Sequence, residues 1–128
     1  MRATQLRRMV MTTTFLAGLA ACGSDGGDTT GPAGGRADLA RGQELFTANC
    51  AVCHGPAAEG TEAGPPLVHI VYEPSHHSDE SFQQAVARGV APHHWEFGPM
   101  PPVSGLDRAD VADITAWVRE QQRAAGIE

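Results

Sequence analysis

The chain has 128 residues, enough for one domain, and only 5% of them are aromatic, which predicts a thin hydrophobic core. Its formal charge of −6 argues against nucleic acid as a partner, because phosphate groups repel a negative surface. The same charge is compatible with a basic protein partner, although it also serves simply to keep an exported domain soluble.

Residues 1–21 have the pattern of a secretory leader. The first eight residues contain three arginines, and the 13 residues from Met9 to Ala21 form an apolar run that is too short to span a membrane. The run ends in Leu19-Ala20-Ala21-Cys22, which resembles the lipobox of bacterial lipoproteins. That resemblance implies a lipoprotein signal peptide that is removed before Cys22, and a lipid carried by Cys22. The alternative is an ordinary cleaved leader followed by a chance cysteine.

Residues 22–35 predict a flexible linker, since they are rich in Gly, Ser, Asp, Thr and Pro and have no apolar periodicity. Removal of the leader takes away three positive charges, so the formal charge changes from −6 to −9. A lipid on Cys22 would tether the remaining domain, residues 36–128, to the periplasmic or extracytoplasmic face of a membrane.

Residues 38–49 predict the first helix, with Asp38 as its N-cap. Gly42 lies on the same face of this helix as Leu45 and Phe46. A glycine inside a helix costs about 1 kcal/mol relative to alanine, so Gly42 indicates that a second helix approaches closely at this point.

The next segment, Cys50-Ala51-Val52-Cys53-His54, has the C-x-x-C-H spacing of c-type haem attachment. Two thiols at this spacing can add to the two vinyl groups of one haem, and the adjacent imidazole is then close to the iron. The alternatives are a redox dithiol or half of a zinc site. A zinc site needs about four nitrogen or sulfur ligands, and the sequence has no second pair of cysteines. A redox motif belongs in a βαβ pattern, for which the sequence shows no strands.

From this motif onward the chain resembles the small class I cytochrome c family, and the resemblance covers residues 38–125. It implies an all-α fold with three main helices around one covalently bound haem c. It also implies that Cys50 and Cys53 attach the haem and that His54 is an axial iron ligand. A large flat apolar ring would provide the core that the sparse aromatic residues do not, so we expect the apoprotein to be poorly folded.

Residues 55–66 predict a loop, and Gly64-Pro65-Pro66-Leu67 resembles the segment that follows the haem motif in the family. The resemblance implies that a proline carbonyl accepts a hydrogen bond from the outer nitrogen of the axial histidine, which makes that histidine a stronger ligand. Pro65 or Pro66 has this role, with Pro65 preferred. The alternative is a rigid turn without any contact to the ligand.

Residues 78–88 predict another helix, with Ser78 as its cap and Gly89 as its end. A proline-rich loop follows and contains Met100 in Gly98-Pro99-Met100-Pro101. The resemblance implies that Met100 is the sixth iron ligand, and it is the sole methionine outside the leader. The alternative is bis-histidine ligation through His93 or His94.

The last helix is predicted over residues 107–125, where Asp107 and Asp110 form a capping-box-like pair. Its apolar stripe includes Trp117, and the family resemblance implies that Gly42 and Phe46 of the first helix pack against it. Arg119 is expected near the C-terminal end, where the helix dipole favours a positive charge.

Two histidine pairs, His76-His77 and His93-His94, depart from the family pattern. One pair precedes a predicted helix and the other follows it, so the four imidazoles could form a copper or zinc site if the two segments meet. The alternatives are exposed loop residues or a hydrogen bond to a haem propionate. Trp95 and Tyr72 are further candidates for such a propionate bond, with core packing as their other role.

A haem with two protein ligands on iron has no open position for substrate, so we expect a one-electron carrier rather than an enzyme. The expected partners are a redox donor and acceptor protein. One alternative is a haem-based enzyme or a sensor that binds a gas or peroxide after Met100 dissociates, although no acid–base pair beside the iron is evident. Another is a haem subunit of a larger oxidoreductase complex.

Overall fold

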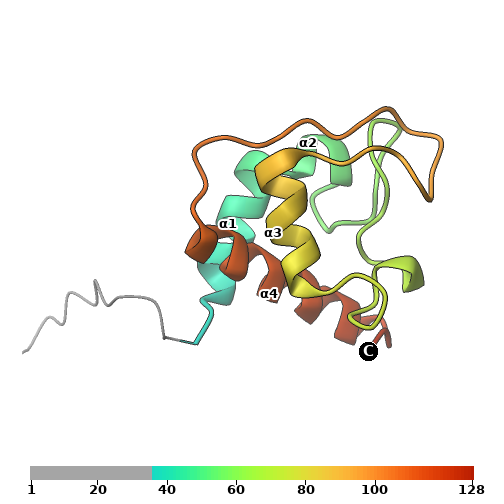
Figure 1. The fold of residues 1–128 in the computed structure, drawn as a ribbon. Coiled ribbons are helices and arrows are strands. Elements are labelled where there is room, and N and C mark those ends of the chain that lie inside the picture. The colour runs from blue at the N-terminus through green and yellow to red at the C-terminus, as the bar shows by residue number, and fades with distance from the viewer. Residues whose placement is uncertain (1–35) are drawn as a thin grey trace, which may run out of the picture. The chain divides into compact units, whose positions relative to one another are not determined.

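The computed structural model describes residues 36–128, and in this part of the chain the fold is all-α, as predicted (Figure 1). Two isolated antiparallel bridges, but no strand, occur among these residues. No helix within residues 36–128 is long and apolar enough to cross a membrane. The predicted leader, the linker and Cys22 lie outside the described residues. The helices are α1 (Leu39–Asn49), α2 (Ala51–His54), the 3-10 helix η1 (Ile70–Tyr72), α3 (Asp79–Arg88) and α4 (Arg108–Ala124).

The ends of the helices follow local sequence signals. The Asp38 carboxylate accepts hydrogen bonds from the first backbone N–H groups of α1, and Asp107 forms a reciprocal capping box with Asp110 at the start of α4. The α3 helix begins after Ser78 as predicted, but the Ser78 hydroxyl makes no capping bond. Instead, the Ser81 hydroxyl donates to the Ser78 carbonyl oxygen at 2.6 Å, so the prediction of a Ser78 side-chain cap was wrong.

The core is formed where α1 packs against α4, and α3 also packs against α4 (Figure 1). Phe46 is fully buried, and its ring centroid lies 4.6 Å from that of Trp117. A Cβ atom on Gly42 would overlap the Asp113 carbonyl oxygen and lie 3.1 Å from the Trp117 Cβ. The close approach of two helices that Gly42 predicted is therefore confirmed.

Arg119 differs from its expected position near an exposed helix end, because it is buried with 5% of its surface accessible. Its guanidinium donates to the Asp79 carboxylate at 2.9 Å, to the Tyr72 carbonyl oxygen at 2.7 Å and to the His77 carbonyl oxygen. It also donates to the Gln122 side chain at 2.7 Å. These bonds attach the segment before α3 to α4. An interaction with the helix dipole, by contrast, would involve α4 alone.

Candidate haem site

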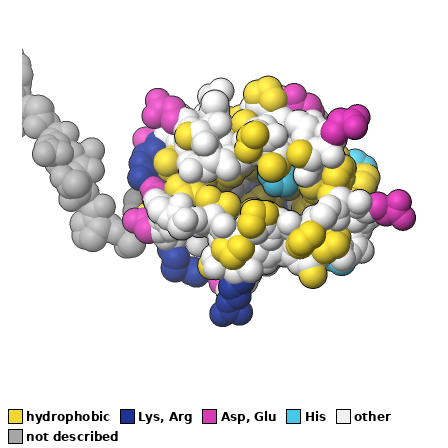
Figure 2. Space-filling model, turned by 90° about the horizontal axis from the view of Figure 1, so that it is seen from above, with side chains coloured by type: hydrophobic (Ala, Val, Ile, Leu, Met, Phe, Trp, Pro, Cys, Tyr) yellow, Lys and Arg dark blue, Asp and Glu magenta, His cyan; other side chains and the backbone are white. Residues whose placement is uncertain are grey.

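A cavity of about 600 Å³ opens between the helices and the loop that joins α3 to α4. In Figure 2 hydrophobic side chains surround the hollow, and histidine side chains are visible in it. Cys50, His54 and Met100, which are predicted site residues, all line this one cavity. Its size and apolar lining are those of a site for a large, mostly apolar ligand.

The haem-attachment motif is held as a single helical turn. The backbone N–H of His54 donates to the Cys50 carbonyl oxygen at 2.9 Å, and the N–H of Cys53 donates to the same oxygen at 3.1 Å. Cys50 and His54 line the cavity, whereas Cys53, which is half-buried, is not among the residues that line it. Burial raises the pKa of the Cys50 thiol to about 11. A redox-active thiol has a lowered pKa, and the pKa of Cys50 is shifted in the other direction.

His54 is buried, with 8% of its surface accessible, and its Nδ1 atom lies 2.9 Å from the Pro65 carbonyl oxygen. Of the two prolines left open by the sequence, the structure has this hydrogen bond on Pro65. The carbonyl can only accept, so Nδ1 carries the proton and Nε2 keeps its lone pair. The Thr61 hydroxyl donates to the Cys53 carbonyl oxygen at 2.6 Å, which ties the loop containing Pro65 back to the motif.

Met100 is positioned by the backbone of its loop. Its N–H donates to the Val90 carbonyl oxygen at 3.0 Å, and the N–H of Val90 donates to the Met100 carbonyl oxygen, also at 3.0 Å. Gly89 makes this pairing possible, because its φ of +73° suits glycine and a Cβ atom there would overlap the Met100 carbonyl oxygen. The loop after α3 thus turns back at Gly89 and brings Met100 to the cavity that contains His54.

His93 and His94 also line the cavity, but their side chains are engaged with other histidines. The Nε2 atom of His94 lies 3.3 Å from that of His76, and the Nε2 atom of His93 lies 3.5 Å from that of His77. The structure therefore brings together both histidine pairs on one side of the cavity. Burial lowers the pKa values of His77 and His94, and the neighbouring imidazoles lower them further.

Trp95 provides an independent test of whether the cavity fits a haem. Its buried indole Nε1 lies near the Tyr72 phenol but makes no well-aligned hydrogen bond within the described residues, although buried polar groups are normally paired. A carboxylate accepts hydrogen bonds, so a haem propionate could pair with this N–H. The buried donor, the apolar lining and the Cys50 thiol in that lining all fit a covalently bound haem.

The sequence reasoning did not identify Arg119 and Gln122 as residues that shape the site. The Gln122 amide donates to the Leu67 carbonyl oxygen at 2.8 Å and to the Tyr72 carbonyl oxygen at 3.0 Å. Together the two side chains hold the segment between the haem motif and α3. One signal was present, since Gln122 lies four residues after Val118 and thus continues the apolar stripe of α4.

Residues 39–122 match a family model described as cytochrome c. The match begins at the first residue of α1 and ends two residues before the last residue of α4. It therefore contains the haem-attachment motif, Pro65 and Met100.

Proposed function

Because the chain belongs to the cytochrome c family, whose members bind haem c covalently and act in electron transfer, we propose that it is a one-electron carrier with His54 and Met100 as iron ligands. The single observation that carries this proposal is that Cys50, His54 and Met100 line the same apolar cavity. Haem c supplies an iron atom that changes between the ferrous and ferric states.

The residues around the two proposed ligands support this assignment. The Pro65 carbonyl holds the His54 ring in one tautomer and makes its Nε2 more basic. The two hydrogen bonds between Val90 and Met100 hold the backbone that carries the thioether. The prolines around Met100 restrict the same loop, so little conformational entropy is lost when the sulfur binds.

Two protein ligands leave no coordination position for a substrate, which favours a carrier over an enzyme. Methionine ligation raises the reduction potential of haem, so the carrier would accept an electron from a reduced donor and pass it to a more oxidising acceptor. A potentiometric titration of the full-length holoprotein tests this, with the haem spectrum as the readout. The proposal predicts one electron per chain and no rapid binding of carbon monoxide to the reduced protein. Rapid carbon monoxide binding would instead support the enzyme or sensor alternative.

We also propose that the carrier works on an extracytoplasmic membrane surface, where the protein is tethered through a lipid on Cys22. Cytochrome c domains are generally extracytoplasmic, which agrees with the leader pattern of residues 1–21. After removal of that leader the formal charge of −9 would speed encounter with partners that present a basic surface. Steering of this kind weakens with salt, so the rate of electron exchange should fall as ionic strength rises.

A further inference from the structure

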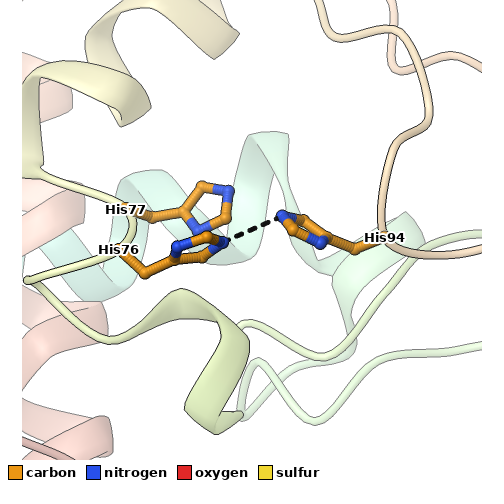
Figure 3. A group of neighbouring side chains, drawn as sticks. All are labelled: His76, His77 and His94. Carbon is orange, nitrogen blue, oxygen red and sulfur yellow. Dashed lines mark hydrogen bonds between the residues drawn. The ribbon is translucent and has the colours of Figure 1, made fainter.

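Four imidazoles meet at the side of the haem cavity, although they come from two segments on either side of α3. The Nε2–Nε2 distances are 3.3 Å for His76 and His94 and 3.5 Å for His77 and His93. One ring nitrogen each from His76, His77 and His94 lies within 4.8 Å of the other two (Figure 3). The four residues are called the histidine quartet below: His76, His77, His93 and His94.

Two members of the quartet have their tautomers fixed by backbone carbonyl groups. The Nδ1 atom of His77 lies 2.7 Å from the Val71 carbonyl oxygen, and the Nδ1 atom of His93 lies 2.9 Å from the Ala91 carbonyl oxygen. Carbonyl oxygens only accept hydrogen bonds, so in the neutral rings both Nδ1 atoms carry the protons. The two Nε2 atoms then have lone pairs and cannot donate to each other across 3.5 Å. A metal cation between them would convert this repulsion into two coordinate bonds.

The spacing of the ring nitrogens distinguishes between metal geometries. Two nitrogens bound to one tetrahedral Zn²⁺ at about 2.0–2.1 Å lie about 3.3–3.4 Å apart. Adjacent nitrogens around a square-planar Cu²⁺ with similar bond lengths lie only about 2.9 Å apart. The observed distances of 3.3 and 3.5 Å agree with two opposite edges of a tetrahedron, and the nitrogens of His76, His77 and His94, which lie within 4.8 Å of one another, would draw closer around the ion.

The quartet is also supported from outside, as metal-binding histidines usually are. Arg119 donates to the His77 carbonyl oxygen, and the backbone N–H of His77 donates to the Glu73 carbonyl oxygen at 2.8 Å. The 3-10 helix η1 provides the Val71 carbonyl that orients the His77 ring. By contrast, His76 and His94 are exposed, so their rings can adjust to an arriving ion.

We propose that the histidine quartet binds one Zn²⁺ ion in a tetrahedral site of four imidazole nitrogens. Zinc does not change its oxidation state under these conditions, so the ion would act structurally and not as a second redox centre. It would join the segment before α3 to the loop after α3, which continues to Met100. Zinc would therefore stabilise the wall of the haem cavity without contacting the iron.

The proposal is tested by calorimetric titration of Zn²⁺ into the untagged full-length holoprotein, with zinc X-ray absorption on the loaded sample. We expect one Zn²⁺ per chain and a first shell of nitrogen only, at about 2.0–2.1 Å. His77→Ala and His94→Ala should each weaken binding about tenfold or more, because loss of an outer-sphere partner alone costs about 10–100-fold. At the same zinc concentration, Zn²⁺ should raise the thermal midpoint of the wild type more than that of His94→Ala.

The matched control is His69→Asn, which removes a histidine outside the quartet. His69 accepts a hydrogen bond from the Val71 N–H at 3.2 Å, and the asparagine oxygen can replace that acceptor. The control should bind Zn²⁺ as the wild type does, and all variants should keep the wild-type haem spectrum. The proposal would be overturned by the absence of saturable binding, by unchanged affinity in both quartet variants, or by sulfur in the zinc shell.

Discussion

The Nδ1 atom of His54 lies 2.9 Å from the carbonyl oxygen of Pro65, and this contact leaves the Nε2 atom of the neutral ring with its lone pair. The haem-attachment motif alone places an imidazole beside two thiols, but it does not fix the tautomer of that imidazole. The Pro65 carbonyl does so from a loop that begins directly after the motif. The loop therefore sets the orientation of the His54 ring. Its hydrogen bond would also increase the basicity of the His54 Nε2 atom if that atom coordinates a metal.

Gly64→Ala tests this role of the loop. A Cβ atom on Gly64 would lie 2.9 Å from the Cys53 carbonyl oxygen, so the backbone beside Pro65 must shift, and we expect this shift to weaken the hydrogen bond between Pro65 and His54. We expect a loss of about 1–3 kcal/mol in the free energy of unfolding, as for other overpacked sites. The reduction potential should rise, because a weaker hydrogen bond makes His54 a poorer donor to ferric iron. The wild type is the reference for both measurements. A reduction potential of Gly64→Ala equal to that of the wild type would contradict the assignment.

Arg119→Ala should lower the free energy of unfolding by about 2–4 kcal/mol, because the buried Gln122 side-chain oxygen and the half-buried His77 carbonyl oxygen lose their donor. Urea denaturation of the holoprotein measures this change. Arg123→Ala is the matched control in the same helix, since its salt bridge to Glu120 is half exposed and such pairs contribute about 0–1 kcal/mol. If the two variants had the same unfolding midpoint, Arg119 would not organise the site.

The acid side of the stability profile should depend on Asp110. The pKa of Asp110 is lowered from its ordinary value of 3.8, first by the hydrogen bond from the Asp107 backbone N–H and also by Arg41. A lowered folded-state pKa gives stability that is present above pH 3.8 and is lost as the pH falls through the folded value. Asp110→Asn should therefore lose less stability than the wild type as the pH falls below about 3.8, and the two should run parallel at higher pH. Urea midpoints measured on both sides of this pH check the prediction, and profiles that stay parallel below it would contradict it.

Cys22→Ala should move the protein from the membrane fraction to the soluble extracytoplasmic fraction while its haem spectrum stays unchanged. The reason is that a lipid on Cys22 would be the tether, and the linker of residues 22–35 has no apolar run to replace it. Fractionation followed by haem detection measures the change. A variant that stays in the membrane fraction to the wild-type extent would show that a partner, and not a lipid, retains the protein.

The sequence predicted best those features that depend on residues close together along the chain. Asp38, Asp107 and Gly89 mark helix ends through local hydrogen bonds and backbone angles, so these boundaries agree with the sequence prediction. Gly42 indicated the close approach of a second helix because a helical glycine is otherwise unfavourable, and the family resemblance identified Trp117 as the residue packed there.

The sequence was less informative where distant segments meet. Arg119 has the same local pattern as an exposed helix-end arginine, and its burial depends on where the chain before α3 lies. The sequence left open whether the two histidine pairs form a metal site or lie on exposed loops. Whether the pairs come together depends on the turn of the chain at Gly89. The choice between Pro65 and Pro66 likewise required the three-dimensional course of the loop.

The most direct test of the central claim is the far-red absorption spectrum of the oxidised full-length holoprotein. A methionine sulfur bound to ferric haem produces a weak sulfur-to-iron charge-transfer band there. The assignment of His54 and Met100 as iron ligands predicts this band in the wild type and its loss in Met100→Ala. Absence of the band in the wild type, or its persistence in Met100→Ala, would contradict the assignment.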